Sequence, residues 1–190
     1  MDARRNLLNA ARDLVAAKGV KAATIAAIAE KAGVAKGLLF YYFDSKESVI
    51  RAVAQELDAE YTAGLRETCR GGRALDCLHA LFRHHFDFLA HNPEGAQFLY
   101  QSAASRLGHG VAGFYEHLYA GIVNVLERGA AAGEFHVADA GELAYMILGS
   151  LHGVGRLKLF DFQRDYDGAS RLCDFYDAVL TGRVQGKEGS

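Results

Sequence analysis

The chain has 190 residues, of which 51% are hydrophobic, and a formal net charge of −2, so it can bury the core of one large domain or two small ones. It contains no apolar run of about eighteen residues, and its N-terminus leads into an amphipathic pattern. We therefore expect neither a membrane span nor a signal peptide, but a cytoplasmic protein. The three cysteines form no C-x-x-C pair, and we expect no disulfide framework.

Helix-forming residues dominate the chain, because alanine and leucine are abundant and Pro93 is its single proline. The periodic patterns predict an all-α fold of about nine helices without strands. Two helices end near Gly19 and Gly33. The others are expected at about 35–42, 46–70, 73–91, 93–107, 111–132, 138–160 and 166–183, followed by a disordered tail.

Charge is distributed unevenly along the chain. Residues 1–50 contain eight Lys or Arg and five Asp or Glu, whereas residues 51–190 contain thirteen and eighteen. A basic N-terminal end on an acidic body is typical of a DNA-binding end joined to a body with another task.

Residues 24–46 have the spacing of a helix-turn-helix. A helix of about eight residues, which Thr24 can cap, is followed by a turn at Gly33 and a second helix of similar length. Ala29, Val34 and Leu39 are well placed to hold the two helices together. The pair Asp44-Ser45 can supply the N-cap of the next helix.

The second helix of this pair has more large side chains than it can bury. If the side chains of Leu39, Phe40 and Phe43 pack inward, other large ones must lie outside: Lys36, Leu38, Tyr41 and Tyr42. Such a surface indicates a contact site, and tyrosine hydroxyls and lysine suit DNA phosphates. The alternative is a packed aromatic edge, with Lys46 an ordinary solvated lysine.

Several segments together carry a family pattern: LLNAARDLVAAKGV, Thr24-x-x-x-Ile28-Ala29, Ala32-Gly33-Val34, Gly37-x-Leu39-Phe40-Tyr41-Tyr42-Phe43 and Ser45-Lys46-Glu47. With them, residues 4–50 resemble the DNA-binding domain of the tetracycline-repressor (TetR) family of bacterial transcriptional regulators. The usual pattern often has threonine in place of Leu38 and histidine in place of Tyr42. The resemblance covers about a quarter of the chain.

The resemblance implies a homodimeric repressor that binds double-stranded DNA at a pseudo-palindromic operator and leaves it when a small-molecule effector binds. It implies a DNA-binding domain at residues 1–46, a ligand-binding and dimerisation body at 47–184 and a tail at 185–190. By position, the residues implied to touch phosphate or the groove are Thr24, Lys36, Tyr41, Tyr42 and Lys46. Those implied to face base edges are Ala35, Gly37 and Leu38.

Aromatic and histidine side chains gather on the helices of the body. Any single one of them is most often a core residue. The sharper interpretation, favoured by the resemblance, is a mainly apolar cavity with a few polar groups. Its expected lining is Phe86, Phe98, Gln101, Phe114, His117, Tyr145 and His152.

The last two helices have apolar faces that need a partner, with small residues that permit close approach. We expect them to form the dimer interface through Leu148, Leu151, Val154, Leu172, Phe175, Tyr176 and Val179. The alternative is that these faces pack within one chain.

Other classes of function have weaker support. No H-E-x-x-H motif or phosphate-gripping glycine loop occurs, and no G-x-S-x-G motif. We therefore expect no enzyme, no cofactor and no metal, although the eight histidines leave a metal site open. Cys69 and Cys77 could form a redox pair, and a helical interaction module that retained the N-terminal head is a third possibility.

Overall fold

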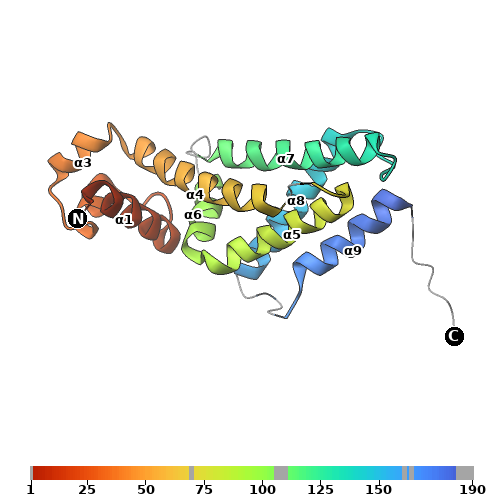
Figure 1. Cartoon of the computed structure of the whole chain (residues 1–190). Coiled ribbons are helices and arrows are strands. Elements are labelled where there is room, and N and C mark those ends of the chain that lie inside the picture. Colours follow the sequence, from red (N-terminus) through yellow and green to blue (C-terminus); the bar gives the residue numbers. More distant parts are fainter. Residues whose placement is uncertain (1, 69–70, 105–110, 160–161, 163–164, 183–190) are drawn as a thin grey trace. The chain divides into compact units, whose positions relative to one another are not determined.

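The computed structural model describes residues 2–68, 71–104, 111–159, 162 and 165–182. Within these residues the chain forms nine α-helices and no strand, which confirms the all-α prediction (Figure 1). The helices are α1 (Ala3–Lys18), α2 (Ile25–Lys31), α3 (Lys36–Tyr42), α4 (Lys46–Thr68), α5 (Ala74–His91), α6 (Pro93–Ala103), α7 (Ala112–Ala131), α8 (Ala140–Leu159) and α9 (Gly168–Thr181).

The helices begin and end close to the predicted residues, except at the end of α6. This helix ends at Ala103, where the N–H of Ala104 bonds the carbonyl oxygen of Tyr100. The predicted continuation to Leu107 and the predicted disordered tail, residues 185–190, lie outside the described residues.

The chain divides into two compact units. The first comprises residues 1–62 and 89–116, and the second comprises residues 63–88 and 117–190. The first unit thus joins the N-terminal helices to most of α4 and to α6, and the expected domain boundary at residue 46 stays a prediction. Aromatic packing contributes to this unit, because the rings of Tyr61 and Phe114 meet edge to face with centroids 5.0 Å apart.

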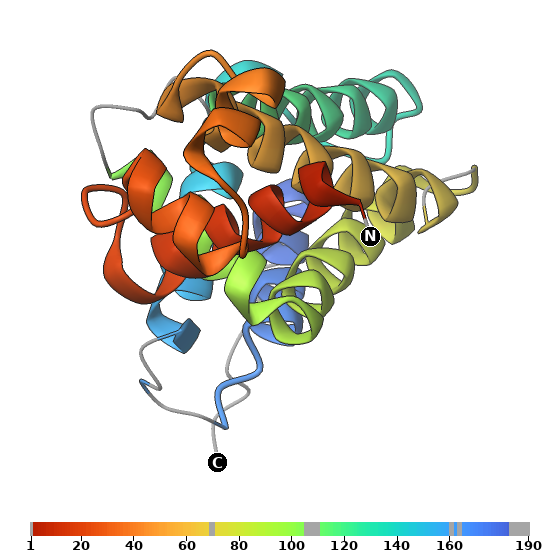
Figure 2. The same cartoon turned by 90° about the vertical axis from the view of Figure 1, so that its left-hand side faces the viewer.

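Local signals set the ends of the first helices, which lie side by side in Figure 2. The Thr24 side chain accepts the Ala27 N–H at 3.1 Å and caps α2. Gly33 has φ +69°, a left-handed conformation that favours glycine, and makes the turn towards α3. Ser45 and Ser48 exchange hydrogen bonds between backbone N–H and side-chain oxygen, each 3.1 Å, at the start of α4.

The core of the helix-turn-helix is apolar and closed. Leu7, Ile28, Leu39 and Val49 are fully buried, one each from the first four helices. Deleting such a side chain typically costs about 2–5 kcal/mol of stability. This core therefore holds α3 firmly by one face and leaves its other face outside.

In the second unit, polar contacts tie distant segments together. The Glu134 carboxylate accepts the N–H groups of Ala74 at 3.0 Å and Leu75 at 3.4 Å, and so caps α5. These two hydrogen bonds, with Arg73 nearby, lower the pKa of Glu134 against the opposing effect of desolvation. His79 on α5 contacts the Asp177 carboxylate on α9.

Candidate nucleic-acid interface

Helix α3 is held by one face, and most of its large side chains lie in solvent. Leu39 is fully buried and Phe43, just after the helix, is nearly so, whereas Tyr41 is 79% exposed and Tyr42 39%. Phe40 is 55% exposed, so the expectation that it packs inward was wrong. The physical reason is the helical repeat: Leu39 and Phe43 are four residues apart on one face, and Phe40 lies about 100° away from Leu39.

The exposed aromatic residues are ordered by contacts with one another. The rings of Tyr41 and Tyr42 meet edge to face with centroids 5.1 Å apart and an interplanar angle of 83°. The Arg4 guanidinium lies 5.6 Å from the centroid of the Phe43 ring. The sequence predicted the exposure of the two tyrosines but not that of Phe40, whose position on the helical repeat was the available signal.

The residues expected to face base edges lie at the beginning of α3. Ala35 and Gly37 are exposed, as is Lys36, and Leu38 is half-buried. A Cβ built onto Gly37 would meet no atom of the described residues within 4 Å, and its φ is not positive. Neither packing within the described chain nor backbone strain therefore requires a glycine at this position.

Thr24 and Lys46 lie at the starts of α2 and α4. Thr24 is exposed, and its hydroxyl accepts the capping bond with its oxygen, which leaves its O–H free to donate to another group. The Lys46 ammonium donates to the carbonyl oxygen of Val20, so this half-buried lysine also links α4 to the segment after α1. An ammonium has three N–H groups, and two of them remain for other partners.

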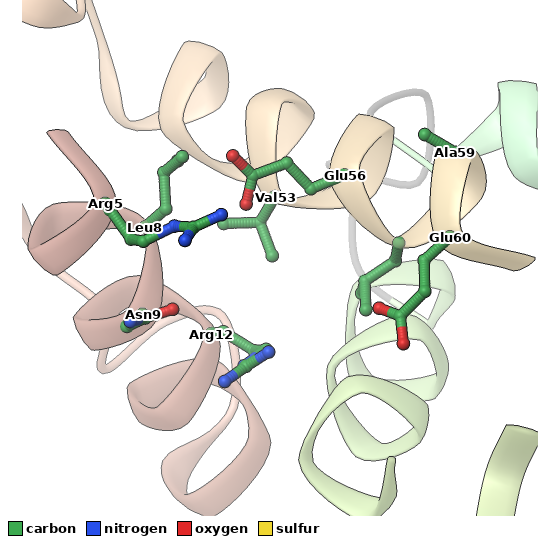
Figure 3. A pocket seen from close by; sticks show the side chains of 9 residues that line it. Arg5, Leu8, Asn9, Arg12, Val53, Glu56, Ala59 and Glu60 are labelled. Atoms are coloured by element: carbon green, nitrogen blue, oxygen red, sulfur yellow. The ribbon is translucent and has the colours of Figure 1, made fainter. Parts of the chain in front are cut away.

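A groove of about 540 Å³ lies between α1 and α4 in the first unit (Figure 3). Its walls carry opposite charges, with arginines on α1 and glutamates on α4, and the side chains of Arg5 and Glu56 point toward one another. Its lining consists of Arg5, Leu8, Asn9, Arg12, Val53, Glu56, Leu57, Ala59 and Glu60. None of the residues expected to line an effector cavity is among them.

The residues expected to line that cavity differ widely in burial. Phe86, Phe98 and Phe114 are buried and His152 is half-buried. Gln101, His117 and Tyr145 are exposed, Tyr145 by 74%. Phe98, Gln101 and Phe114 belong to the first unit and the other four to the second. The seven-residue lining stays a prediction.

Within the second unit, His85 lies next to this set and was not predicted. It is buried, its ring meets that of Phe86 edge to face at 5.5 Å, and His152 acts on it electrostatically. Burial is the main cause that lowers the pKa of His85 to about 3, and the like charges of His84 and His152 add to it. Burial also lowers the pKa of His152. His85 is therefore neutral near pH 7.

The expected dimer residues separate into two groups. Leu151, Leu172 and Tyr176 are at most 8% exposed, so the chain itself already covers most of these side chains, and their role in an interface stays a prediction. Tyr176 hydrogen-bonds Ser150 at 2.9 Å and joins α9 to α8. The amphipathic pattern showed that these helices have apolar faces, but it did not show which face the chain covers itself.

The remaining positions lie outside that core. Phe175 is 59% exposed and Val179 46%, whereas Leu148 and Val154 are half-buried. On α8 the exposed large apolar side chains also include some that were not predicted for this role. We define the α8–α9 apolar face by Tyr145, Met146, Leu157, Phe175 and Val179. The spacing from Met146 through Gly149 and Gly153 to Leu157 was the signal for the α8 part.

The cysteines differ in their bonding. Cys77 is disulfide-bonded, contrary to the expectation of no disulfide framework, and Cys173 keeps a free thiol whose pKa burial raises to about 11. Cys69 lies outside the described residues, so a redox pair with Cys77 stays a hypothesis.

Over the described residues no group of three or more His, Cys, Asp or Glu is arranged to hold a metal ion. No described helix is long and apolar enough to cross a membrane.

Comparison with known proteins gives matches over the N-terminal segment and over the whole fold. Residues 7–53 match the family model described as bacterial regulatory proteins, tetR family. The chain is similar to the HTH-type transcriptional repressor KstR2 of Rhodococcus jostii, with 28% identity over 160 residues that cover 76% of this chain and 74% of that protein.

Solved structures share the fold. The fatty acid degradation regulator FadR from Bacillus halodurans has a TM-score of 0.82 and 22% identity, with 98% of each chain covered. The transcriptional regulator FadR from Bacillus subtilis, solved in complex with stearoyl-CoA, has a TM-score of 0.79 and 21% identity, with 94% of this chain and 98% of that chain covered.

Proposed function

We propose that this chain, which belongs to the tetR family of bacterial regulatory proteins, is a homodimeric repressor. It leaves a palindromic operator when a small molecule binds. It is a ligand-responsive DNA-binding regulator, and we infer that regulation rather than catalysis is its whole task. Repression, rather than activation, is supported by the similarity to KstR2, which is a transcriptional repressor.

The observation that carries the proposal is the surface of α3. Large side chains of α3 lie in solvent, although the opposite face of the helix is fixed in the core. The side chain of Tyr41, for example, is 79% exposed. Exposing such residues has an energetic cost unless a partner covers them, and a helix of this kind fits the major groove of duplex DNA. The exposed Lys36 and the hydroxyls of Thr24, Tyr41 and Tyr42 suit phosphate oxygens.

A second copy of the chain is the proposed occupant of the α8–α9 apolar face. Large apolar side chains exposed together on neighbouring helices are typical of an interface. In a symmetric dimer the same face serves both subunits. Two helix-turn-helix heads then read half-sites about 34–36 Å apart or a multiple of that distance, which requires a palindromic operator.

The effector acts through its differential affinity for the DNA-bound and DNA-free forms. The choice of the first compound to test is guided by the FadR of Bacillus subtilis, whose structure contains stearoyl-CoA. We propose a coenzyme A thioester with a long acyl chain as that compound. Within the second unit, the buried Phe86 and the half-buried His152 are the first residues to test for effector binding.

The experiment starts from purified full-length protein mixed with fragmented genomic DNA of its source, followed by sequencing of the retained fragments. We expect enrichment of a short palindrome beside a few genes. The Tyr41→Ala variant, checked for an unchanged dimer, should retain much less of it. Stearoyl-CoA should then release the wild-type complex, with coenzyme A alone as the control.

The outcomes separate the parts of the proposal. Enrichment without release by stearoyl-CoA supports the DNA-binding function and removes that effector. Absence of any enriched sequence, from a folded dimer, contradicts the repressor and favours a helical interaction module that retained the head.

A further inference from the structure

The side of α3 that faces away from the core offers little that can hydrogen-bond a base. Gly37, Leu38 and Tyr41 lie three and four residues apart on this side, opposite Leu39. Ala35, just before the helix, is also exposed. The three residues expected to face base edges, Ala35, Gly37 and Leu38, carry no polar side chain, and the polar groups beside them are those of Lys36 and Tyr41.

Hydrogen-bonded readout needs particular side chains. Bidentate recognition of guanine uses arginine or lysine, and that of adenine uses asparagine or glutamine. Residues 35–42 contain no arginine, asparagine or glutamine, and Lys36 is their one lysine. The one apolar group that a base pair presents in the major groove is the C5 methyl of thymine. An apolar side chain can therefore distinguish thymine without any hydrogen bond.

Close approach to the groove floor is possible at this point of the helix. A Cβ on Gly37 would have free space among the described residues, so the glycine is not needed for packing there. Its missing side chain lets the backbone come near the bases, and the neighbouring half-buried Leu38 can then reach a methyl group.

Deepening the proposed DNA-binding function, we propose that α3 reads its operator mainly through thymine methyl groups, with Leu38 as the specificity-determining side chain. Lys36 and Tyr41 are assigned to the phosphate backbone, where they add affinity without sequence preference. Half-sites should therefore contain thymines at fixed positions whose methyl groups are required.

The test uses the duplex enriched from genomic DNA, resynthesised with deoxyuridine in place of each half-site thymine in turn. Uracil lacks the C5 methyl but keeps all hydrogen-bonding groups of thymine. We expect about a fourfold loss of affinity at one or two positions, the loss that follows from one buried methyl group. Replacing guanines by 7-deazaguanine, which lacks the N7 acceptor, should have little effect.

Variants assign the effect to one side chain. Leu38→Ala should bind thymine and uracil duplexes nearly equally, as a double-mutant cycle requires for a direct contact. Leu38→Met conserves volume and should keep the discrimination, which guards against a mere folding defect. Lys36→Ala should weaken binding to both duplexes by the same factor.

Two results would overturn the inference. One is tight operator binding that uracil changes by less than about twofold at every position. The other is discrimination that survives in Leu38→Ala. Either result leaves the repressor function standing, whereas failure to enrich any operator overturns that function and the readout with it.

Discussion

Replacing Gly37 by alanine should separate the stability of the head from its binding to DNA. Gly37 is the second residue of α3, and an added Cβ meets no described atom within 4 Å. Glycine within a helix costs roughly 0.5–1 kcal/mol relative to alanine. Because α3 is short, we expect the lower end, a gain of about 0.5 kcal/mol in the free energy of unfolding. For a chain of this size that gain raises the Tm by about 1–2 °C.

Binding should change in the opposite direction. A methyl group placed where the backbone approaches the groove is an overpacking defect, and such defects typically cost about 1–3 kcal/mol. Gly37→Ala should therefore bind its operator between about fivefold and about 150-fold more weakly. The assays are thermal unfolding by circular dichroism and an equilibrium titration of the operator duplex.

Gly113 offers a matched control. It is exposed, is the second residue of α7, and an added Cβ there also meets no described atom within 4 Å. Gly113→Ala should raise the Tm similarly and leave operator affinity unchanged. Unchanged affinity in Gly37→Ala would refute the close approach of α3 to the groove, and a lower Tm would show that something in the chain occupies the space beside Gly37.

Three other perturbations have defined outcomes. Lys46→Met removes the hydrogen bond to Val20 and should lower the free energy of unfolding by roughly 1.5–3 kcal/mol. It also removes a charge expected to bind phosphate, so the salt dependence of operator binding should fall by about one phosphate. A salt slope equal to that of the wild type would exclude the phosphate contact. Phe175→Glu places a charge on the α8–α9 apolar face and should yield monomers in analytical ultracentrifugation without unfolding the helices, whereas a persistent dimer would place the interface elsewhere. The pKa of His85 in the folded chain is about 3, below its value in the unfolded chain, so the unfolded chain takes up the proton first as pH falls. The free energy of unfolding should therefore decrease as pH drops from about 6.5 towards 3, by at most about 1.4 kcal/mol per pH unit. Denaturant titrations of His85→Gln should show a shallower fall than the wild type, and an equal fall would remove His85 as its source.

Signals that act within a few residues were sufficient to predict the head. The Thr24 cap, the left-handed Gly33 and the serine at the start of α4 each depend only on neighbouring backbone groups. The same is true of the helical repeat that separates Leu39 from Tyr41. Helix-turn-helix geometry and its exposed tyrosines could thus be predicted from the sequence.

Long-range packing accounts for what the sequence did not predict. The contact between Lys46 and Val20 joins residues 26 positions apart, and no local pattern indicates it. Tyr176 and Phe175 are adjacent on α9, yet one is buried against Phe82 and the other exposed. Which apolar face a chain covers with its own helices depends on their arrangement, and periodicity alone indicates only that such faces exist.

A footprint of the bound operator tests the central claim, that α3 of each subunit reads one half of a palindromic DNA site, most directly. Hydroxyl-radical cleavage of the enriched duplex should show two protected segments on one face, centred about 34–36 Å apart or a multiple of it, with two chains bound per duplex. Tyr41→Ala should lose both protected segments together. Uniform protection that grows with DNA length would contradict sequence reading by α3.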